Sequence, residues 1–146
     1  MIELVTEQNF GELLPLIKKY QEFYEVPDPS IEKNRSFFAQ FWGGTATGAQ
    51  FICRVDNQAV GFATLYFSYS SSITSKVAIM NDLYVEPEYR RRGLAGALIN
   101  HCHAYGNSNG AARLQWVTAK DNTRAQSAYE KLGAKASDWV LYTYSP

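Results

Sequence analysis

Apolar residues recur along the chain with two different periods. Before residue 45 they recur every three or four residues, which predicts a helix over residues 12–24 and a second one between Ser30 and Gly43. A short apolar segment at residues 2–5 predicts a strand ahead of them. Pro15 is the awkward residue, because proline is tolerated mainly in the first turn of a helix, so we expect the first helix to begin near Glu12.

From residue 49 to residue 85 the period falls to two, as in strands. Residues 51–55 and 59–69 predict two antiparallel strands joined by a turn at residues 56–58. Residues 76–85 are apolar on both faces, which is typical of a central strand.

The remainder of the chain alternates between helix and strand. A helical pattern covers residues 94–105, a strand is predicted at residues 112–119, and Asn122 and Gly133 bound another helix. Residues 138–144 predict a last strand. The order β-α-α-β-β-β-α-β-α-β indicates an α/β (α+β) fold in a single domain over residues 1–146, with a mixed, mostly antiparallel sheet flanked by about four helices.

The composition is that of a globular protein. With 146 residues, 46% of them hydrophobic and 19% charged, the chain is long enough for one core. It has no apolar run of the roughly 20 residues that span a bilayer and no secretory signal pattern, so we expect a cytoplasmic protein with no membrane partner. Cys53, Cys102 and His101 show no metal-ligand spacing and are expected to serve packing, so no metal is predicted.

The net charge is zero but unevenly distributed. Residues 1–32 hold seven acidic residues against two lysines, whereas residues 87–135 hold eight basic residues against three acidic ones. The first excess favours a cationic ligand and the second an anionic one. With zero net charge and a single basic cluster, a nucleic-acid partner is not expected.

The stretch NDLYVEPEYRRRGLAGAL, residues 81–98, carries the strongest chemical signal. A strand ends, three arginines follow, and small residues lead into a helix. The first N–H groups of a helix lack partners, and small residues let a ligand approach the backbone closely, so the stretch predicts a phosphate-binding site. The stretch lacks the Gly-Lys-Ser/Thr of a P-loop and the third glycine of a dinucleotide fingerprint.

Two motifs resemble the signature of the GNAT-type N-acetyltransferase superfamily. Residues 90–95 (RRRGLA) are similar to its Arg/Gln-x-x-Gly-x-Gly/Ala motif. Residues 122–125 (NTRA), followed by residues 129–134 (YEKLGA), are similar to its Asn-x-x-Ala helix that carries a tyrosine. The motifs stand in the family's order with a strand between them, and the pattern is closest to polyamine, histone and D-amino-acid acetyltransferases.

The resemblance implies an acetyl-CoA site. Main-chain N–H groups of the arginine-glycine loop would wrap the pyrophosphate, and the arginines would add contacts to phosphate. The pantetheine arm would run beside the strand end, where the next strand splays away in this family. The candidate cofactor-binding residues are Leu83, Tyr84, Val85, Arg90, Arg91, Arg92, Gly93, Leu94, Ala95, Gly96, Asn122, Ala125 and Tyr129.

Tyr129 is the candidate general acid. A phenol with a pKa near 10 is protonated at pH 7, while a thiol such as that of CoA has a pKa near 8.5, so Tyr129 can protonate the departing thiolate. Without the motif, Tyr129 would be read as a core aromatic on the inner face of its helix. Asn122 is equally well explained as a helix cap.

Asn81 and Asp82 form a polar pair inside an otherwise apolar strand. Because burying a lone carboxylate is costly, we expect Asp82 to face a cavity or to be hydrogen-bonded. Diamine and polyamine acetyltransferases, which the chain resembles here, typically carry Glu-Asp, so Asn81 replaces the glutamate. Asp82 is the candidate catalytic base or amine anchor, with a structural role as the alternative. Glu86 is a weaker candidate.

The expected reaction is direct acetyl transfer from acetyl-CoA to the primary amine of a polyamine, an amino acid or a lysine-like side chain. The candidate substrate-binding residues are Tyr24, Glu25, Asp28, Asn81 and Asp82. The partner is then a small-molecule amine or a basic peptide, and the resemblance suggests a homodimer. The alternatives are a histone-lysine, protein-lysine or N-terminal acetyltransferase, and a CoA-binding regulatory module without turnover.

Overall fold

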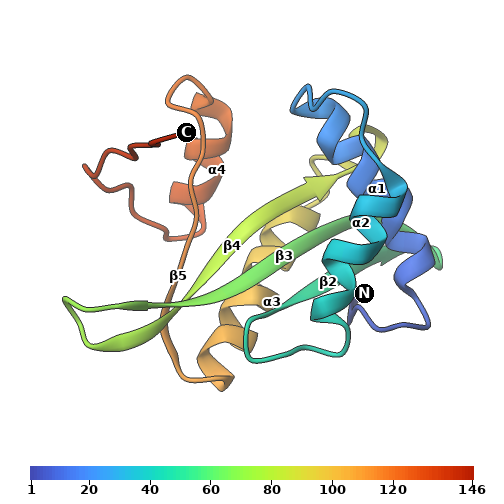
Figure 1. The fold of residues 1–146 in the computed structure, drawn as a ribbon. Coiled ribbons are helices and arrows are strands. Elements are labelled where there is room, and N and C mark those ends of the chain that lie inside the picture. The colour runs from blue at the N-terminus through green and yellow to red at the C-terminus, as the bar shows by residue number, and fades with distance from the viewer. The chain divides into compact units, whose positions relative to one another are not determined.

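The computed structural model describes every residue from Met1 to Pro146. It consists of two compact units, Met1–Trp116 and Val117–Pro146 (Figure 1). The first unit contains the sheet and three α-helices, and the second contains one α-helix. None of these helices is long and apolar enough to cross a bilayer.

A five-stranded sheet organises the first unit, with the strands in the order β1-β2-β3-β4-β5. Strands β1 (Ile2–Leu4), β2 (Gly48–Val55), β3 (Gln58–Ser70) and β4 (Ser75–Val85) are antiparallel neighbours. Strand β5 (Ala111–Gln115) runs parallel to β4. The predicted mixed, mostly antiparallel sheet is therefore confirmed.

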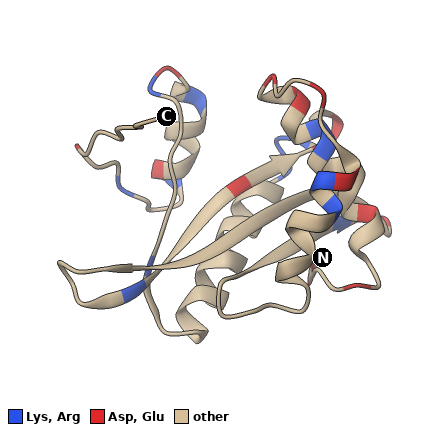
Figure 2. Ribbon diagram, viewed as in Figure 1, with Lys and Arg blue, Asp and Glu red and all other residues tan.

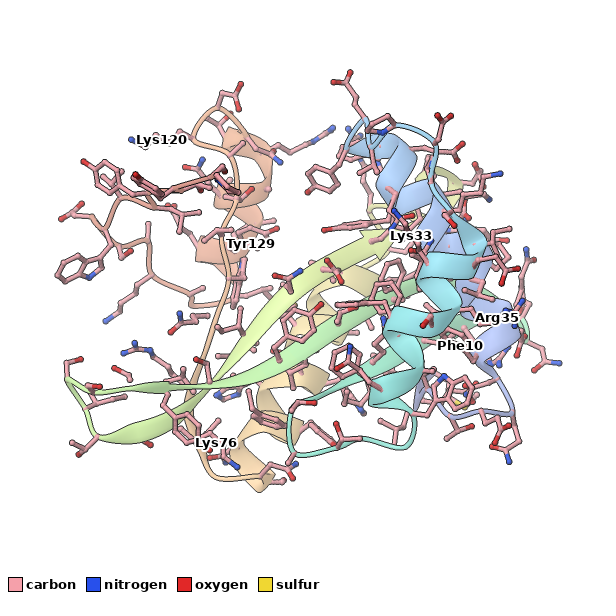
Figure 3. The ribbon with its side chains drawn as sticks, in the orientation of Figure 1. Phe10, Lys33, Arg35, Lys76, Lys120 and Tyr129 are labelled. Carbon is pink, nitrogen blue, oxygen red and sulfur yellow. The ribbon has the colours of Figure 1, made fainter.

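Helices cover both faces of this sheet. Helices α1 (Phe10–Phe23) and α2 (Ile31–Phe38), with the short 3-10 helix Ala39–Phe41, lie on one face, and α3 (Leu94–Ser108) lies on the other (Figure 1). Phe10, the first residue of α1, belongs to the core on this face (Figure 3). Its ring centre lies 5.2 Å from that of Trp42.

The strands meet α1 through a row of large apolar side chains. Ile52, Phe62 and Tyr84 stand opposite one another on β2, β3 and β4, and all three belong to the core that α1 and α2 cover. Because side chains alternate along a strand, the residues two positions away in each strand point to the same face. This alternation places Gln50, Thr64 and Asp82 on the α1 face as well.

Local sequence explains several element boundaries. The Ser30 hydroxyl accepts the Lys33 N–H at 3.2 Å and caps α2. Asp56 and Asn57 both have positive φ, at 49° and 66°, as a tight two-residue hairpin turn requires. In the second unit, α4 (Thr123–Lys131) begins after Asn122 as predicted. These turn and cap predictions are confirmed.

Several boundaries differ from the predictions: β2 begins at Gly48 rather than residue 51, and α3 runs to Ser108 rather than residue 105. Helix α1 begins at Phe10 rather than near Glu12, with Pro15 inside it. Pro15 lies close enough to the start of α1 that it removes a single helix bond, the one to the Gly11 carbonyl, and apolar packing of α1 outweighs that loss. Strand β5 ends at Gln115, four residues before the predicted end.

The predicted last strand is wrong. Residues 132–146 contain no helix or strand. The second unit holds no strand with which residues 138–144 could pair, and a single strand without a partner is not stable. The alternation of apolar residues in this segment therefore does not produce a strand.

The cysteines and the histidine singled out in the sequence serve packing. Cys53 and Cys102 are free and buried, as predicted, and burial raises the pKa of the Cys102 thiol to about 12. The His101 ring centre lies 4.7 Å from that of Phe51, between α3 and the sheet. Residues 1–146 contain no group of three His, Cys, Asp or Glu side chains placed to hold a metal ion.

Candidate functional site

The N-terminus of α3 presents backbone N–H groups without partners. Gly93 is the N-cap, with a φ of 79°, and no side chain caps the helix. The first bond inside the helix joins the Ala97 N–H to the Gly93 carbonyl at 3.0 Å, so the N–H groups of residues 94–96 have no acceptor in the helix. This end of a 15-residue helix is partly positive and suited to an anion.

The loop before α3 has an unusual backbone. Arg91 has a φ of 62° and Gly93 a φ of 79°, both in the left-handed region that non-glycine residues rarely adopt. Backbone of this kind turns successive N–H groups toward one side and clusters at ligand sites. The Arg91 side chain is exposed and forms no hydrogen bond or ion pair within residues 1–116, so it is free to contact a ligand.

Arg90 has a different environment. Its Nε donates to the Val85 carbonyl at 2.8 Å, and its guanidinium lies 5.8 Å from the centre of the Tyr84 ring and 5.9 Å from that of Phe23. These contacts tie the loop to the end of β4 and to the last residue of α1. Arg90 therefore holds the loop against β4 and α1.

One edge of β4 is open beyond Ile79. Strand β4 pairs with β3 as far as Val85, but its pairing with β5 ends where Ile79 meets Gln115. Residues 80–85 therefore have no strand of the first unit on that edge. Such an edge offers main-chain N–H and C=O groups to which an extended amide chain binds as an extra strand. The pairing of β4 with β5 thus ends before the stretch at which the resemblance places the pantetheine arm, and the splay itself stays a prediction.

A β-bulge lies in the middle of this open stretch. Leu65 pairs with Met80 and Thr64 pairs with Asp82, so Asn81 is the extra residue on β4. The Asn81 side chain is exposed, and its Nδ2 donates to Asp82 Oδ1 at 3.0 Å. The bulge is what places the two polar side chains side by side.

Asp82 is a buried carboxylate without a counter-charge. It is 6% exposed and is the only acidic residue in strands β2 to β5. Figure 2 shows the same contrast, with charges concentrated on the helices and loops and the strands mostly uncharged. No cationic side chain of the first unit forms an ion pair with Asp82. A buried unpaired carboxylate is a favourable site for an incoming cation.

The neighbours of Asp82 in the sheet are polar as well. Gln50, Thr64 and Asp82 stand opposite one another on β2, β3 and β4. Gln50 Nε2 donates to the Thr64 hydroxyl at 2.8 Å, and the Gln50 Oε1 atom is buried without a partner. This row interrupts the apolar core at the position of Asp82.

Two tyrosines lie close to Asp82. Burial first, then the charge of Asp82 and a hydrogen bond to it, raise the pKa of Tyr20 well above its ordinary value. Burial and the same charge raise the pKa of Tyr66 to about 12. The sequence pattern assigned Tyr20 to an apolar position of the first helix and missed this contact. A signal was available, because a phenol on the inner face of a helix needs a polar partner, as does a buried carboxylate.

The predicted amine-site residues are only partly brought together. The Tyr24 ring centre lies 4.9 Å from that of Tyr20, which connects Tyr24 to the group formed by Asn81 and Asp82. Glu25 and Asp28 lie in the exposed loop between α1 and α2, and no hydrogen bond or ion pair joins either to that group.

Glu86 belongs to a separate ion pair. It is 8% exposed, and its Oε1 lies 2.6 Å from the Nζ of Lys19. The hydrogen bond to Glu86 raises the pKa of Lys19. The Glu86 carboxylate therefore forms an ion pair that links α1 to the end of β4.

The second unit carries the second motif. The Asn122 side chain accepts the Ala125 N–H at 3.2 Å, so it caps α4. Gln126 Nε2 donates to the carbonyls of Ala119 and Lys120, both at 3.0 Å, which fixes the preceding loop. Tyr129 lies on α4 (Figure 3) and is partly buried. Ala125 is four residues before it and therefore shares its face of the helix. Their contacts with acetyl-CoA stay predictions.

Known proteins resemble this chain in sequence and in structure. The model of the acetyltransferase (GNAT) family matches residues 13–134. The chain is 33% identical over 134 residues to the D-amino-acid N-acetyltransferase HPA3 of Saccharomyces cerevisiae, covering 87% of this chain and 79% of that protein. It is 26% identical over 156 residues to the thialysine N-epsilon-acetyltransferase of Bos taurus, covering 99% and 91%.

A solved structure resembles it too. The crystal structure of a probable acetyltransferase superposes with a TM-score of 0.86 at 30% identity, covering 100% of this chain and 97% of that one. The family match spans most of the chain and includes both the α3 loop and α4. The chain therefore belongs to the acetyltransferase (GNAT) family and is an acetyl-CoA-dependent N-acetyltransferase.

Proposed function

We propose that the protein transfers the acetyl group of acetyl-CoA directly to a primary amine of a small cationic molecule. The observation that carries this proposal is the buried, unpaired carboxylate of Asp82, which stands on the same open stretch of β4 that suits an extended amide chain. A positively charged amine supplies the counter-charge that Asp82 lacks.

Acetyl-CoA is held by main-chain groups in this proposal. The N–H groups of Leu94, Ala95 and Gly96 bind the pyrophosphate, and Arg91 and Arg92 contact the phosphates. The pantetheine amides pair with the open edge at Leu83–Val85. The absence of a side-chain cap at α3 and the positive φ of Gly93 support this assignment, because both leave the N–H groups accessible.

The acetyl transfer itself removes two protons from the amine nitrogen and adds one to the CoA sulfur. The bound ammonium gives one proton to Asp82, directly or through water, and its nitrogen lone pair then attacks the thioester carbonyl carbon. The tetrahedral intermediate collapses, the C–S bond breaks, and Tyr129 gives its phenolic proton to the departing thiolate. The nitrogen of the new amide gives its second proton to the Tyr129 phenolate, and solvent accepts the proton from Asp82, so one proton is released overall. No covalent acetyl-enzyme is required.

This mechanism requires both units to work as a single domain over residues 1–146. The family match over residues 13–134 supports that arrangement because it runs through both units. The location in the cytoplasm and the homodimer, both expected from the sequence, belong to the same proposal.

The relatives support a small acceptor. They are named for D-amino acids and for thialysine, which are small molecules with a primary amine. A polyamine, an amino acid or a free lysine-like compound is therefore the proposed acceptor class. The second candidate is a lysine side chain in a basic peptide.

An assay of CoA thiol release tests the proposal. Purified protein is mixed with acetyl-CoA and, in turn, with polyamines, amino acids of both configurations, lysine analogues and basic peptides. Amine-dependent thiol release with at least one small amine is the expected result. Tight CoA binding with no thiol release across the panel would instead support a regulatory module without turnover. Strongly salt-dependent duplex binding would point to a nucleic-acid partner.

A further inference from the structure

Tyr20 reaches Asp82 from a different element of the fold. It lies near the end of α1, and its ring centre is 5.7 Å from that of Phe62 and 6.5 Å from that of Tyr84. Phe62 and Tyr84 stand one row away from Thr64 and Asp82 on the same face of the sheet. The aromatic contacts therefore place the ring of Tyr20 above the strands, beside the row that holds Thr64 and Asp82.

The chemistry of the pair allows one direction of hydrogen bonding. A carboxylate has no hydrogen to donate, so the Tyr20 phenol is the donor. Its high pKa, which comes from burial and from Asp82, keeps the phenol protonated in this role. Asn81 Nδ2 is a second donor, at 3.0 Å from Oδ1. Donors from α1 and from the bulge of β4 thus converge on one carboxylate.

The other polar neighbours do not share this role. The pKa of Tyr66 rises through burial and the charge of Asp82, with no hydrogen bond to it, and the Tyr66 ring packs 5.4 Å from that of Phe41. Tyr24 contacts the ring of Tyr20 rather than Asp82, and its side chain is exposed. Thr64 already accepts from Gln50.

We propose that Tyr20 is a positioning residue for Asp82. The Tyr20 phenol donates a hydrogen bond that fixes the carboxylate in the orientation that receives the amine. This inference rests on the proposed function, because it takes Asp82 as the group that meets the amine. Charge-assisted hydrogen bonds are directional and stronger than neutral ones, so loss of the donor leaves the carboxylate free to rotate. The amine then meets a less well-ordered acceptor, while acetyl-CoA binding is unaffected.

A double-mutant cycle tests the inference. Tyr20→Phe, Asp82→Asn and the double variant are compared in kcat and KM for an accepted amine and for acetyl-CoA. Tyr20→Phe is expected to lower kcat/KM for the amine about tenfold with KM for acetyl-CoA unchanged. In the Asp82→Asn background the same substitution is expected to cost less than about twofold, because the carboxylate charge that the hydroxyl would orient is gone.

Tyr66→Phe is the matched control, since it removes one phenolic oxygen from a neighbouring residue. It is expected to change kcat/KM for the amine less than about threefold. Thermal unfolding of Tyr20→Phe shows whether the retained ring still packs, and a melting temperature close to wild type is expected.

The outcomes separate this inference from the function on which it rests. A tenfold loss that persists in the Asp82→Asn background means that Tyr20 acts through packing, and it overturns the inference. So does unchanged kinetics of Tyr20→Phe when Asp82→Asn is impaired. Unchanged kinetics of Asp82→Asn overturns the assignment of Asp82 and the inference with it. Wild-type protein that acetylates no amine overturns both.

Discussion

The side-chain amide of Asn81 donates a hydrogen bond to the carboxylate of Asp82, with Nδ2 3.0 Å from Oδ1. The diamine and polyamine acetyltransferases that the chain resembles typically carry a glutamate at the position of Asn81, and a glutamate could not donate in this way. The exchange converts a second negative charge into a donor, so this stretch of β4 carries a single carboxylate.

A charge-restoring substitution tests the consequence for substrate choice. We expect Asn81→Glu to raise the ratio of kcat/KM for a diamine over a monoamine roughly threefold, because an exposed added carboxylate attracts a second ammonium group weakly. Steady-state kinetics with a matched diamine and monoamine measures the ratio. Asn81→Gln keeps the amide and serves as the control. Equal ratios in wild type and Asn81→Glu would show that position 81 does not select for charge.

A pair of glycines tests the cofactor loop. Gly93 and Gly110 lie just before and just after α3 and its C-cap, with φ of 79° and 88°, and a Cβ on either would meet no atom within 4 Å. Gly93→Ala and Gly110→Ala should therefore destabilise the fold by similar amounts, about 1 kcal/mol. Only Gly93→Ala should weaken CoA binding, by about tenfold, because it shifts the loop before the free N–H groups.

Calorimetric titration of CoA into the two variants gives the comparison. Matched melting temperatures would confirm that the two substitutions cause equal strain. If both variants bound CoA with the same affinity, the phosphate site would not lie at the N-terminus of α3.

The general acid has its own test in the second unit. Tyr129→Phe should lower kcat about 100-fold while leaving CoA affinity nearly intact, because the phenolic proton is needed only as the C–S bond breaks. Tyr144→Phe removes a phenol from a fully exposed side chain of the same unit and should change neither quantity. Stopped-assay turnover and CoA titration give the two values. If Tyr129→Phe turned over as fast as the wild type, Tyr129 would not be the general acid.

The stability of the fold should depend on pH through His101. Burial lowers the pKa of the His101 imidazole below its ordinary 6.5. Between the lowered pKa of the folded chain and the ordinary pKa of the unfolded chain, the unfolded chain binds more protons. The free energy of unfolding therefore decreases as the pH drops below 6.5. Chemical denaturation between about pH 7.5 and pH 5.5 measures this dependence.

His101→Gln should show a shallower loss of stability over that interval than wild type. His103→Gln, which replaces an exposed imidazole on the same helix, is the matched control. Identical slopes for wild type and His101→Gln would mean that His101 titrates in the folded protein as it does in the unfolded chain.

What the sequence could predict depended on how local the interaction was. Ser30, Asn122 and the turn at Asp56 and Asn57 act within a few residues of themselves, so composition and spacing predicted them correctly. The α3 loop was predicted for the same reason, because small residues and a helix start are adjacent in the chain. The strand predicted at residues 138–144 is absent, because a strand also needs a partner and alternation does not supply one.

The amine side of the site depended on contacts between distant residues. Tyr20 and Asp82 lie on different elements, and only the packing of α1 against the sheet brings them together. The ion pair of Lys19 with Glu86, 67 residues apart, comes from the same packing and gives Glu86 a partner that residue types alone did not reveal. The bulge at Asn81 is a property of the pairing between β3 and β4, which residue types alone did not reveal.

Mass spectrometry of the products tests whether the acetyl group passes from CoA to an amine nitrogen. The protein is incubated with acetyl-CoA labelled in the acetyl group and with the amine that gives the fastest thiol release. We expect one labelled acetyl group on the amine nitrogen for each CoA thiol released, and none on the protein. Thiol release with the label recovered as free acetate, or label retained on the protein, would contradict it.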